Sequence, residues 1–263
     1  MKKRVLITVK TYPNPSKNYI ETVCTAGLDE DLNWIRLYPI PFRAKPLNQQ
    51  FKKFQWIEVD LVKTEKHKDF RPESHRLADI EDEISTGEEV SSWDVRNQFI
   101  LHNVYDNLDQ LINASQEPTN TSIAVFKPTI WEKSSYVATE REWTQKQKDN
   151  MLQMNIFDTV PRNPLRKIPF EFKYSFADAA GRKSTMQILD WEIGQLYWNC
   201  FDKSQDEGLA CKQVLDKLDR LANDRDLYLI LGTTFEHHQR RFPNPFTIIG
   251  LFYPPKDDQI SIF

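Results

Sequence analysis

The chain has 263 residues, of which 40 % are hydrophobic and 28 % are charged, a composition that excludes a disordered protein. Only 7 residues are Gly, so we expect no nucleotide site built from Gly-rich phosphate loops. No apolar run approaches the roughly 18 residues of a membrane span. The three cysteines have no metal-type spacing, and their odd number suits a reducing compartment. We therefore expect a cytoplasmic protein with no metal, no cofactor and no membrane partner.

The net charge of −3 hides an uneven distribution along the chain. Residues 1–76 carry a net charge of +6, residues 77–117 carry −9, and the remainder is neutral. A near-neutral total therefore does not exclude a basic face that binds a polyanion. The acidic zone is either a solvated linker and helix start or a segment that covers the basic face until a partner displaces it.

Apolar periodicity and turn residues predict strands and helices in chain order. The expected strands are residues 4–10, 19–26, 34–40, 54–62, 122–126, 168–176, 185–189, 227–232 and 246–253. The expected helices begin at Ser91 or Ser92 and run through Asn113, cover 140–153, follow Asp190, and cover 206–222. Polar, basic loops are expected at 63–76 and 233–245.

The early strands are joined by short turns, and helices do not alternate with strands one for one. This order disfavours a doubly wound parallel sheet. It predicts a β-rich α+β protein with two compact antiparallel barrels or sheets and with helices between and after them. We expect an N-terminal module over 1–127, a helical and Pro-rich connection over 128–164, and a C-terminal module over 165–263.

One pattern resembles a metal-dependent nuclease site. Glu171 and Lys173 share a face of a predicted strand, and Asp158 precedes them. An Asp followed by Glu-x-Lys can hold Mg²⁺ and activate a water for phosphodiester cleavage. Since Glu-x-Lys also occurs on ordinary solvent-facing strand edges, this site is an alternative hypothesis.

The main functional signal is a mixture of aromatic and basic residues on predicted strands and loops. Trp34, Arg36 and Tyr38 alternate with apolar residues, so we expect them on an outward face that Arg43 extends. Aromatic rings stack bases, and cations hold phosphates. The same residues also occur on any half-exposed sheet, which is the ordinary structural interpretation.

Two loops repeat this mixture. The loop at 63–76 contains Lys, His, Phe and Arg residues. The loop at 233–245 contains a basic run that ends in an aromatic residue. The residues of interest are Lys68, Phe70, Arg71, His75, Arg76, Arg240 and Arg241.

Three stretches resemble bacterial proteins described as dual OB-containing, which tend to sit beside phage-defence genes. They are YIETVCTAG at 19–27 running on to WIRLYPIPFR at 34–43, DWEIGQLY at 190–197, and IIGLFYPPK at 248–256. The resemblance implies two OB-like barrels and a nucleic-acid-binding or defence-associated role. It also implies Cys or His residues in the turn matching 175–184, where this sequence has none.

We therefore expect a non-catalytic protein that binds single-stranded DNA or RNA, as the recognition subunit of an anti-phage system with a possible protein partner. Trp34, Tyr38 and Phe70 would stack bases. The residues expected to hold phosphates are Arg36, Arg43, Lys68, Arg71 and Arg76. The alternatives are a nuclease using Asp158, Glu171 and Lys173, and a protein–protein adaptor whose aromatic residues form an interface.

Overall fold

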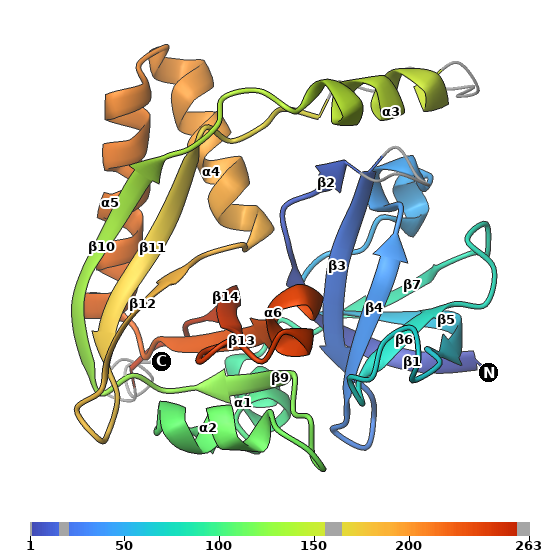
Figure 1. Ribbon diagram of the computed structural model, residues 1–263, viewed down its shortest axis with the longest axis horizontal. Coiled ribbons are helices and arrows are strands. Elements are labelled where there is room, and N and C mark those ends of the chain that lie inside the picture. Colours follow the sequence, from blue (N-terminus) through green and yellow to red (C-terminus); the bar gives the residue numbers. More distant parts are fainter. Residues whose placement is uncertain (1, 16–20, 156–164, 257–263) are drawn as a thin grey trace.

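The computed structural model describes residues 2–15, 21–155 and 165–256 of the chain. Two bodies lie side by side, the first built from N-terminal strands and the second from the later strands with α4 (Trp191–Ser204) and α5 (Glu207–Asp224) (Figure 1). The structure is mixed α+β and rich in strands, which confirms the predicted class. Within the described ranges, no helix is long and apolar enough to span a bilayer.

Five N-terminal strands close into a barrel. They are β1 (Lys2–Lys10), β3 (Glu21–Leu28), β4 (Trp34–Ile40), β5 (Gln55–Lys63) and β6 (Ser74–Leu77). Their order is β1-β3-β4-β6-β5, and β5 pairs again with β1 to close the circuit. The β4–β6 pair is parallel, and the other pairs are antiparallel.

The barrel interior is filled because apolar residues alternate along these strands. On β5, Ile57, Val59 and Leu61 are buried while Glu58 and Asp60 face outward, as the sequence predicts. The remaining residues of the barrel core are Val5, Ile7, Val23, Ile35, Leu37, Ile40, Phe42, Phe51, Leu77 and Ile84. Short elements extend the barrel: β2 (Asn14–Pro15), two 3-10 turns (Phe42–Ala44 and Leu47–Gln49) and β7 (Ser85–Glu89).

The helix predicted to run through Asn113 is two helices. The structure has α1 (Trp93–Ile100), the short strand β8 (Val104–Tyr105) and α2 (Leu108–Ala114). Ser92 caps α1, as expected, but Asn107 starts a second helix because its side chain accepts a hydrogen bond from the Gln110 amide at 3.0 Å. The apolar spacing continues across this break, so periodicity alone does not reveal it.

The later strands form two connected sheets. The strands are β9 (Ile123–Phe126), β10 (Ile130–Ala138), β11 (Phe170–Ala177), β12 (Lys183–Gln187), β13 (Tyr228–Thr233) and β14 (Phe246–Phe252). One sheet has the order β10-β11-β12, and the other has β14-β13-β9-β8. They are joined twice, because β9 continues into β10 after three residues and Ile188 forms a parallel bridge with Ile248.

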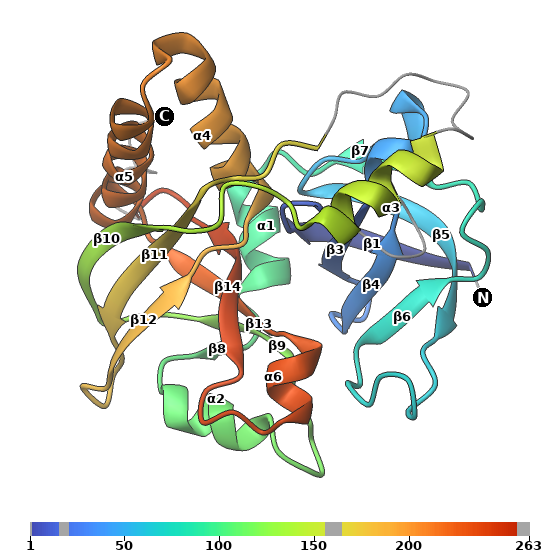
Figure 2. The same cartoon turned by 45° about the horizontal axis from the view of Figure 1, so that its top comes forward.

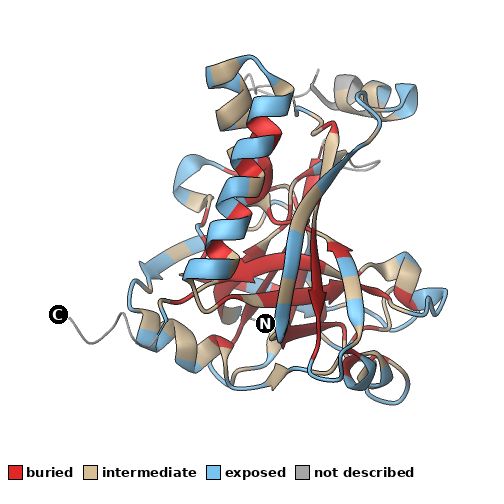
Figure 3. Ribbon diagram, turned by 90° about the vertical axis from the view of Figure 1, so that its left-hand side faces the viewer, coloured by how far each residue is buried: buried red, intermediate tan, exposed pale blue. Residues whose placement is uncertain are grey.

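Helices flank these sheets. The chain passes from β10 through α3 (Gln145–Asn155), which contacts β2 and lies over the barrel strands in the view of Figure 2. Asp190 caps α4 and Asp206 caps α5, so both predicted helices are confirmed. Buried and exposed positions alternate along α5, whose apolar stripe packs against the C-terminal core (Figure 3). The short helix α6 (Phe235–Gln239) lies in the region expected to be a loop.

Shared apolar clusters hold the two bodies together. Val9 and Ala26 of the barrel pack with Ile123, Ile230 and Ile249 of the C-terminal strands. A second cluster, in which α1 also takes part, contains Leu28, Phe54, Ile100, Val125 and Phe252. The barrel and the C-terminal sheets are therefore packed as one unit.

Candidate nucleic-acid interface

The outer face of β3 and β4 is largely covered, contrary to the sequence-based expectation. Arg36 is 3 % exposed, and its Nη2 donates to the Ser122 carbonyl at 2.9 Å and to the Ser122 Oγ at 3.2 Å. Burial lowers the pKa of this guanidinium. Trp34 is half-buried between both shared clusters. The prediction that Arg36 lies on an open face is wrong, because the alternation that identifies an outer face does not reveal what packs on it.

Arg71 is also buried. Its Nε and Nη2 hold the Asp69 carboxylate at 2.8 and 2.6 Å, and its Nη1 donates to the Thr233 carbonyl at 3.0 Å. The expectation that Arg71 is an exposed phosphate contact is therefore wrong. It joins the barrel to the end of β13.

The other predicted residues of the barrel differ in exposure. Tyr38 is 49 % exposed, so one of the three residues predicted on the β4 face is open to solvent. Arg43 is ion-paired with Glu21 at 2.9 Å. His75 is half-buried against the Glu73 carbonyl, and burial lowers its pKa.

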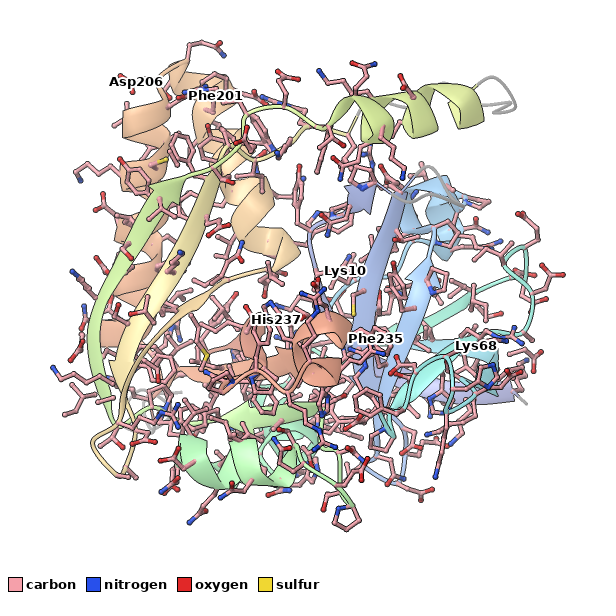
Figure 4. All side chains as sticks on the ribbon, in the orientation of Figure 1. Lys10, Lys68, Phe201, Asp206, Phe235 and His237 are labelled. Carbon is pink, nitrogen blue, oxygen red and sulfur yellow. The ribbon has the colours of Figure 1, made fainter. Side chains whose placement is uncertain are left out.

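The two basic loops of the sequence come together, although about 160 residues separate them. Phe70 of the β5–β6 loop packs against Phe235 of α6 at 6.1 Å between ring centroids and against His238 at 4.8 Å. Figure 4 shows Lys68 on the barrel and Phe235 and His237 on α6. We use the name "basic ridge" for the exposed side chains of these two loops: Lys66, His67, Lys68, Arg240 and Arg241.

The basic ridge keeps cations available to an anion. Lys68 pairs with Glu65 at 2.9 Å and Arg240 with Glu236 at 3.0 Å, but both pairs are exposed and therefore weak. Among the described residues, no carboxylate lies within ion-pair distance of Lys66 or Arg241. Arg76 is exposed nearby in sequence, on β6.

A flat aromatic surface adjoins the ridge. Phe242 is 38 % exposed and stacks on His237, with ring centroids 4.4 Å apart and planes at 14°. Stacked and partly exposed rings offer a surface on which a base can continue the stack. The predicted residues Arg240 and Arg241 thus adjoin the stacked rings of His237 and Phe242 along the chain, and the contact of Phe70 with α6 joins their loop to the loop of Lys68.

The outer face of β11 and β12 is polar and partly open. Its side chains are those that alternate with the buried Phe172, Tyr174 and Met186. Lys183 and Thr185 are exposed, Glu171, Lys173 and Gln187 are half-buried, and Ser175 is buried. A pocket of about 290 Å³ connects this face, at Glu171 and Gln187, with Tyr12 of the barrel.

This face also holds the proposed nuclease pair. Glu171 and Lys173 share it, as expected, but they pair with one another at 3.2 Å. Asp158 lies outside the described residues. Within the described ranges, no three His, Cys, Asp or Glu side chains are grouped so as to hold a metal ion, and Cys24, Cys200 and Cys211 are free thiols. Cleavage by these residues stays an untested alternative.

Sequence reasoning missed a second pocket, which surrounds Lys10 at the end of β1. Three aromatic rings contributed by Phe42, Phe51 and Trp191 lie 4.4 to 5.7 Å from its ammonium group. The sequence shows Lys10 at the end of an apolar strand. It does not show that aromatic rings from distant segments surround this lysine.

Taken together, these features define an α+β protein with a closed N-terminal barrel and a basic, aromatic surface where the barrel meets the C-terminal strands. The chain belongs to the family described as Domain of unknown function (DUF8757), whose match covers residues 104–263, more than half of the chain. Residues 1–102 match a second family, Domain of unknown function (DUF8758). No curated protein matches the chain.

Proposed function

We propose that the chain contains two OB-like barrels and binds single-stranded nucleic acid without catalysis. The strand order of the N-terminal barrel supports the first half of this proposal. Numbered within the barrel, its five strands follow the order 1-2-3-5-4 and close on strand 1, with strands 3 and 5 parallel. OB-folds are five-stranded Greek-key barrels with this order.

The C-terminal strands support a second barrel of the same order. If β9 and β10 are one bent first strand, then β11, β12, β13 and β14 are strands two to five. The first strand pairs with the second through β10 and with the fourth through β9. The parallel bridge between Ile188 and Ile248 links the third strand to the fifth, and α4 and α5 follow the third strand.

OB-folds bind oligonucleotides on the face of their second and third strands, on the loop between strands one and two, and on the loop between strands four and five. In this chain the two basic loops, 64–73 and 234–245, are the loops between strands four and five of the two proposed barrels. Phe70 of the first loop packs against Phe235 and His238 beside the second, so we assign the cations of both loops to one binding surface. This contact is the observation that carries the proposal.

The open β11–β12 face belongs to the same surface in this proposal. The corresponding β3–β4 face is occupied by the packing around Arg36 and Ser122. We therefore assign the strand to the β11–β12 face and the basic ridge, with phosphates on Arg240, Arg241 and Lys173 and a base on Phe242.

Charge reversal on the ridge tests the proposal. Fluorescence anisotropy with labelled 20-mer DNA and RNA measures the affinity at several salt concentrations. We expect Arg240→Glu/Arg241→Glu to weaken binding about tenfold or more, and to make the salt slope shallower by about 1.4, since each phosphate contact on a single strand contributes about 0.7.

The matched control is Lys212→Glu/Lys217→Glu, which makes the same charge change on exposed positions of α5. We expect this control to bind like the unmodified protein, apart from a small shift due to net charge. Equal losses in both variants, or binding that does not respond to salt, would reject the proposed interface.

The resemblance to dual OB-containing proteins extends the proposal to a role as the recognition subunit of an anti-phage system, together with a protein partner. The same ridge variant tests that role in cells. If it is correct, Arg240→Glu/Arg241→Glu abolishes protection in a phage plating assay while the α5 control retains it. Protection that survives the ridge variant would separate the defence role from nucleic-acid binding.

A further inference from the structure

A second pocket of about 350 Å³ lies at the junction of the barrel, α1, the start of α4 and the end of β14. Lys10, which lines it, is found where the barrel meets the C-terminal strands (Figure 4). The pocket walls are unusually rich in aromatic rings and in cations. The cations are Lys10, Lys52, Lys53 and Arg96, and the rings that the inference uses are those of Trp93 and Trp191.

Two of the four cations are already neutralised by carboxylates. Lys53 is buried and lies 3.0 Å from Asp190 and 3.2 Å from Glu192. Lys52 pairs with Glu89 at 3.1 Å. These two lysines therefore form part of the wall and leave no unmatched charge.

Lys10 and Arg96 differ, because no carboxylate of the described residues lies within ion-pair distance of either. The Lys10 Nζ donates to the Phe51 carbonyl at 2.9 Å and lies over Phe42 and Trp191. The Arg96 Nε donates to the Val90 carbonyl at 2.6 Å. Its guanidinium lies 4.2 Å from the centroid of Phe54 and 4.9 Å from that of Trp93. Both cations thus keep donors for an anion.

The environment of Lys10 is poor in compensating charge. Burial is the main cause that lowers the pKa of Lys10 to about 8, and the neighbouring Lys53 lowers it further. Glu192 and Asp190 raise it, but less than burial lowers it. An anion that enters the pocket would stabilise the charged form of Lys10, so binding and protonation support each other.

We infer that this pocket binds one nucleotide, with the phosphate at Lys10 and the base among the rings of Trp93 and Trp191, in a pocket that Arg96 also lines. A phosphate alone would leave most of a 350 Å³ pocket empty and the rings unused. An uncharged aromatic ligand would leave the two cations without a partner. A nucleotide satisfies both requirements, and this inference does not rest on strand binding at the basic ridge.

The bound nucleotide is either a free mononucleotide or the 5′-phosphorylated end of a strand. Isothermal titration with AMP and with UMP measures the site directly. We expect saturable binding of one equivalent, and inorganic phosphate should bind at least tenfold more weakly. Phosphate that binds as tightly as AMP, or the lack of saturable binding of both nucleotides at millimolar concentration, would overturn the inference.

Variants at Lys10 assign the binding to this pocket. Lys10→Met keeps the aliphatic stem and should weaken AMP binding at least tenfold, while Lys10→Arg keeps the charge and should stay within about threefold. The control is Arg166→Met in the neighbouring pocket, where Arg166 lies 3.6 Å from the centroid of Trp198. Equal weakening by Lys10→Met and Arg166→Met would overturn the assignment. Thermal unfolding confirms that each variant is folded.

Competition experiments distinguish a free mononucleotide from the 5′-phosphorylated end of a strand as the ligand of this pocket. Displacement of AMP by a 5′-phosphorylated oligonucleotide, but not by its 5′-hydroxyl form, supports the pocket as a site for strand ends. Displacement by neither supports a site for free nucleotides. The ridge variant Arg240→Glu/Arg241→Glu should retain AMP binding in both cases, so failure of the proposed strand interface and failure of this pocket are distinguishable.

Discussion

The outer face of β3–β4 and the outer face of β11–β12, which correspond to one another if the proposed second barrel is correct, have opposite surroundings. On the first, Arg36 and Ala26 are buried against residues 122–123 and β14. On the second, Lys173 and Gln187 remain partly exposed beside a pocket. A polar or basic strand face can therefore serve as an internal joint in one half and as an open surface in the other.

Three of the four buried lysine and arginine side chains among the described residues lie at the junction. Arg36, Lys53 and Arg71 each belong to the barrel and each reach a group of the C-terminal half. The fourth, Lys45, stays within the N-terminal half, where it donates to the Ile80 and Asp82 carbonyls. The cations of the basic ridge are exposed instead. We therefore expect substitutions at the junction to change stability, and substitutions on the open face to change binding.

The largest effect is expected for Lys53→Met. Burial alone would lower the pKa of Lys53, but Asp190 and Glu192 raise it above its ordinary value, so the charged form is strongly stabilised in the folded protein. Removing it leaves the buried Asp190 carboxylate without a counter-charge, and the free energy of unfolding in urea should fall by about 3–5 kcal/mol.

Two further variants test whether the effect of Lys53→Met arises from its buried ion pair. Lys173→Met on the open face should change the free energy of unfolding by no more than about 0.5 kcal/mol. Adding Asp190→Asn to Lys53→Met removes the stranded charge, so the double variant should be more stable than the sum of the single effects. A strictly additive double variant would contradict direct coupling.

Arg36→Met should have the next largest effect. The substitution removes the charged donor of the Ser122 carbonyl, which then keeps the Thr233 amide at 2.9 Å, and it breaks into a network where the Ser122 amide and hydroxyl donate to Glu73 at 3.1 and 2.6 Å. We expect a loss of about 2–3 kcal/mol in urea unfolding. The exposed Arg76→Met is the control and should stay within about 0.5 kcal/mol. Equal effects at the two positions would contradict the role of Arg36 as a joint.

The smallest effect concerns pH. His238 is buried between the Thr233 hydroxyl and the Ser115 carbonyl, and burial is the main cause that lowers its pKa; nearby Arg71 and Arg36 also lower it. Because the folded state binds this proton less readily than the unfolded state, stability should decline as the pH falls below about 6.5. His238→Gln should reduce that decline between pH 7.5 and 5.5. Part of the decline should persist in this variant, because burial also lowers the pKa of His75. An unchanged slope would exclude His238 as a contributor.

Much of the fold could be predicted from local pattern. Alternation placed β4 at residues 34–40 and separated the two faces of β5, and helix caps placed the starts of α1, α4 and α5. The strand β10 was missed because most of its side chains are exposed, so it carries no clear alternation. The helix α6 was missed because five residues are too few for a periodic signal.

The candidate site was less predictable, because it depends on contacts between distant segments. The sequence marked both basic loops but gave no means to place Phe70 against α6. It assigned Arg36 to solvent because Arg36 alternates with apolar residues, and Arg71 because it lies in a polar, basic loop, while here each of them donates to a backbone carbonyl of the other half. The rings around Lys10 come from three separate stretches, so no local motif announces them.

The cluster of Val9, Ala26, Ile123, Ile230 and Ile249 crosses the border between the two family matches, which falls near residue 103. If either half were lost, the remaining half would expose these apolar side chains to solvent and would tend to aggregate. We therefore expect the two halves to be inherited as a pair, or the missing half to be replaced by a separately encoded subunit that covers the same patch.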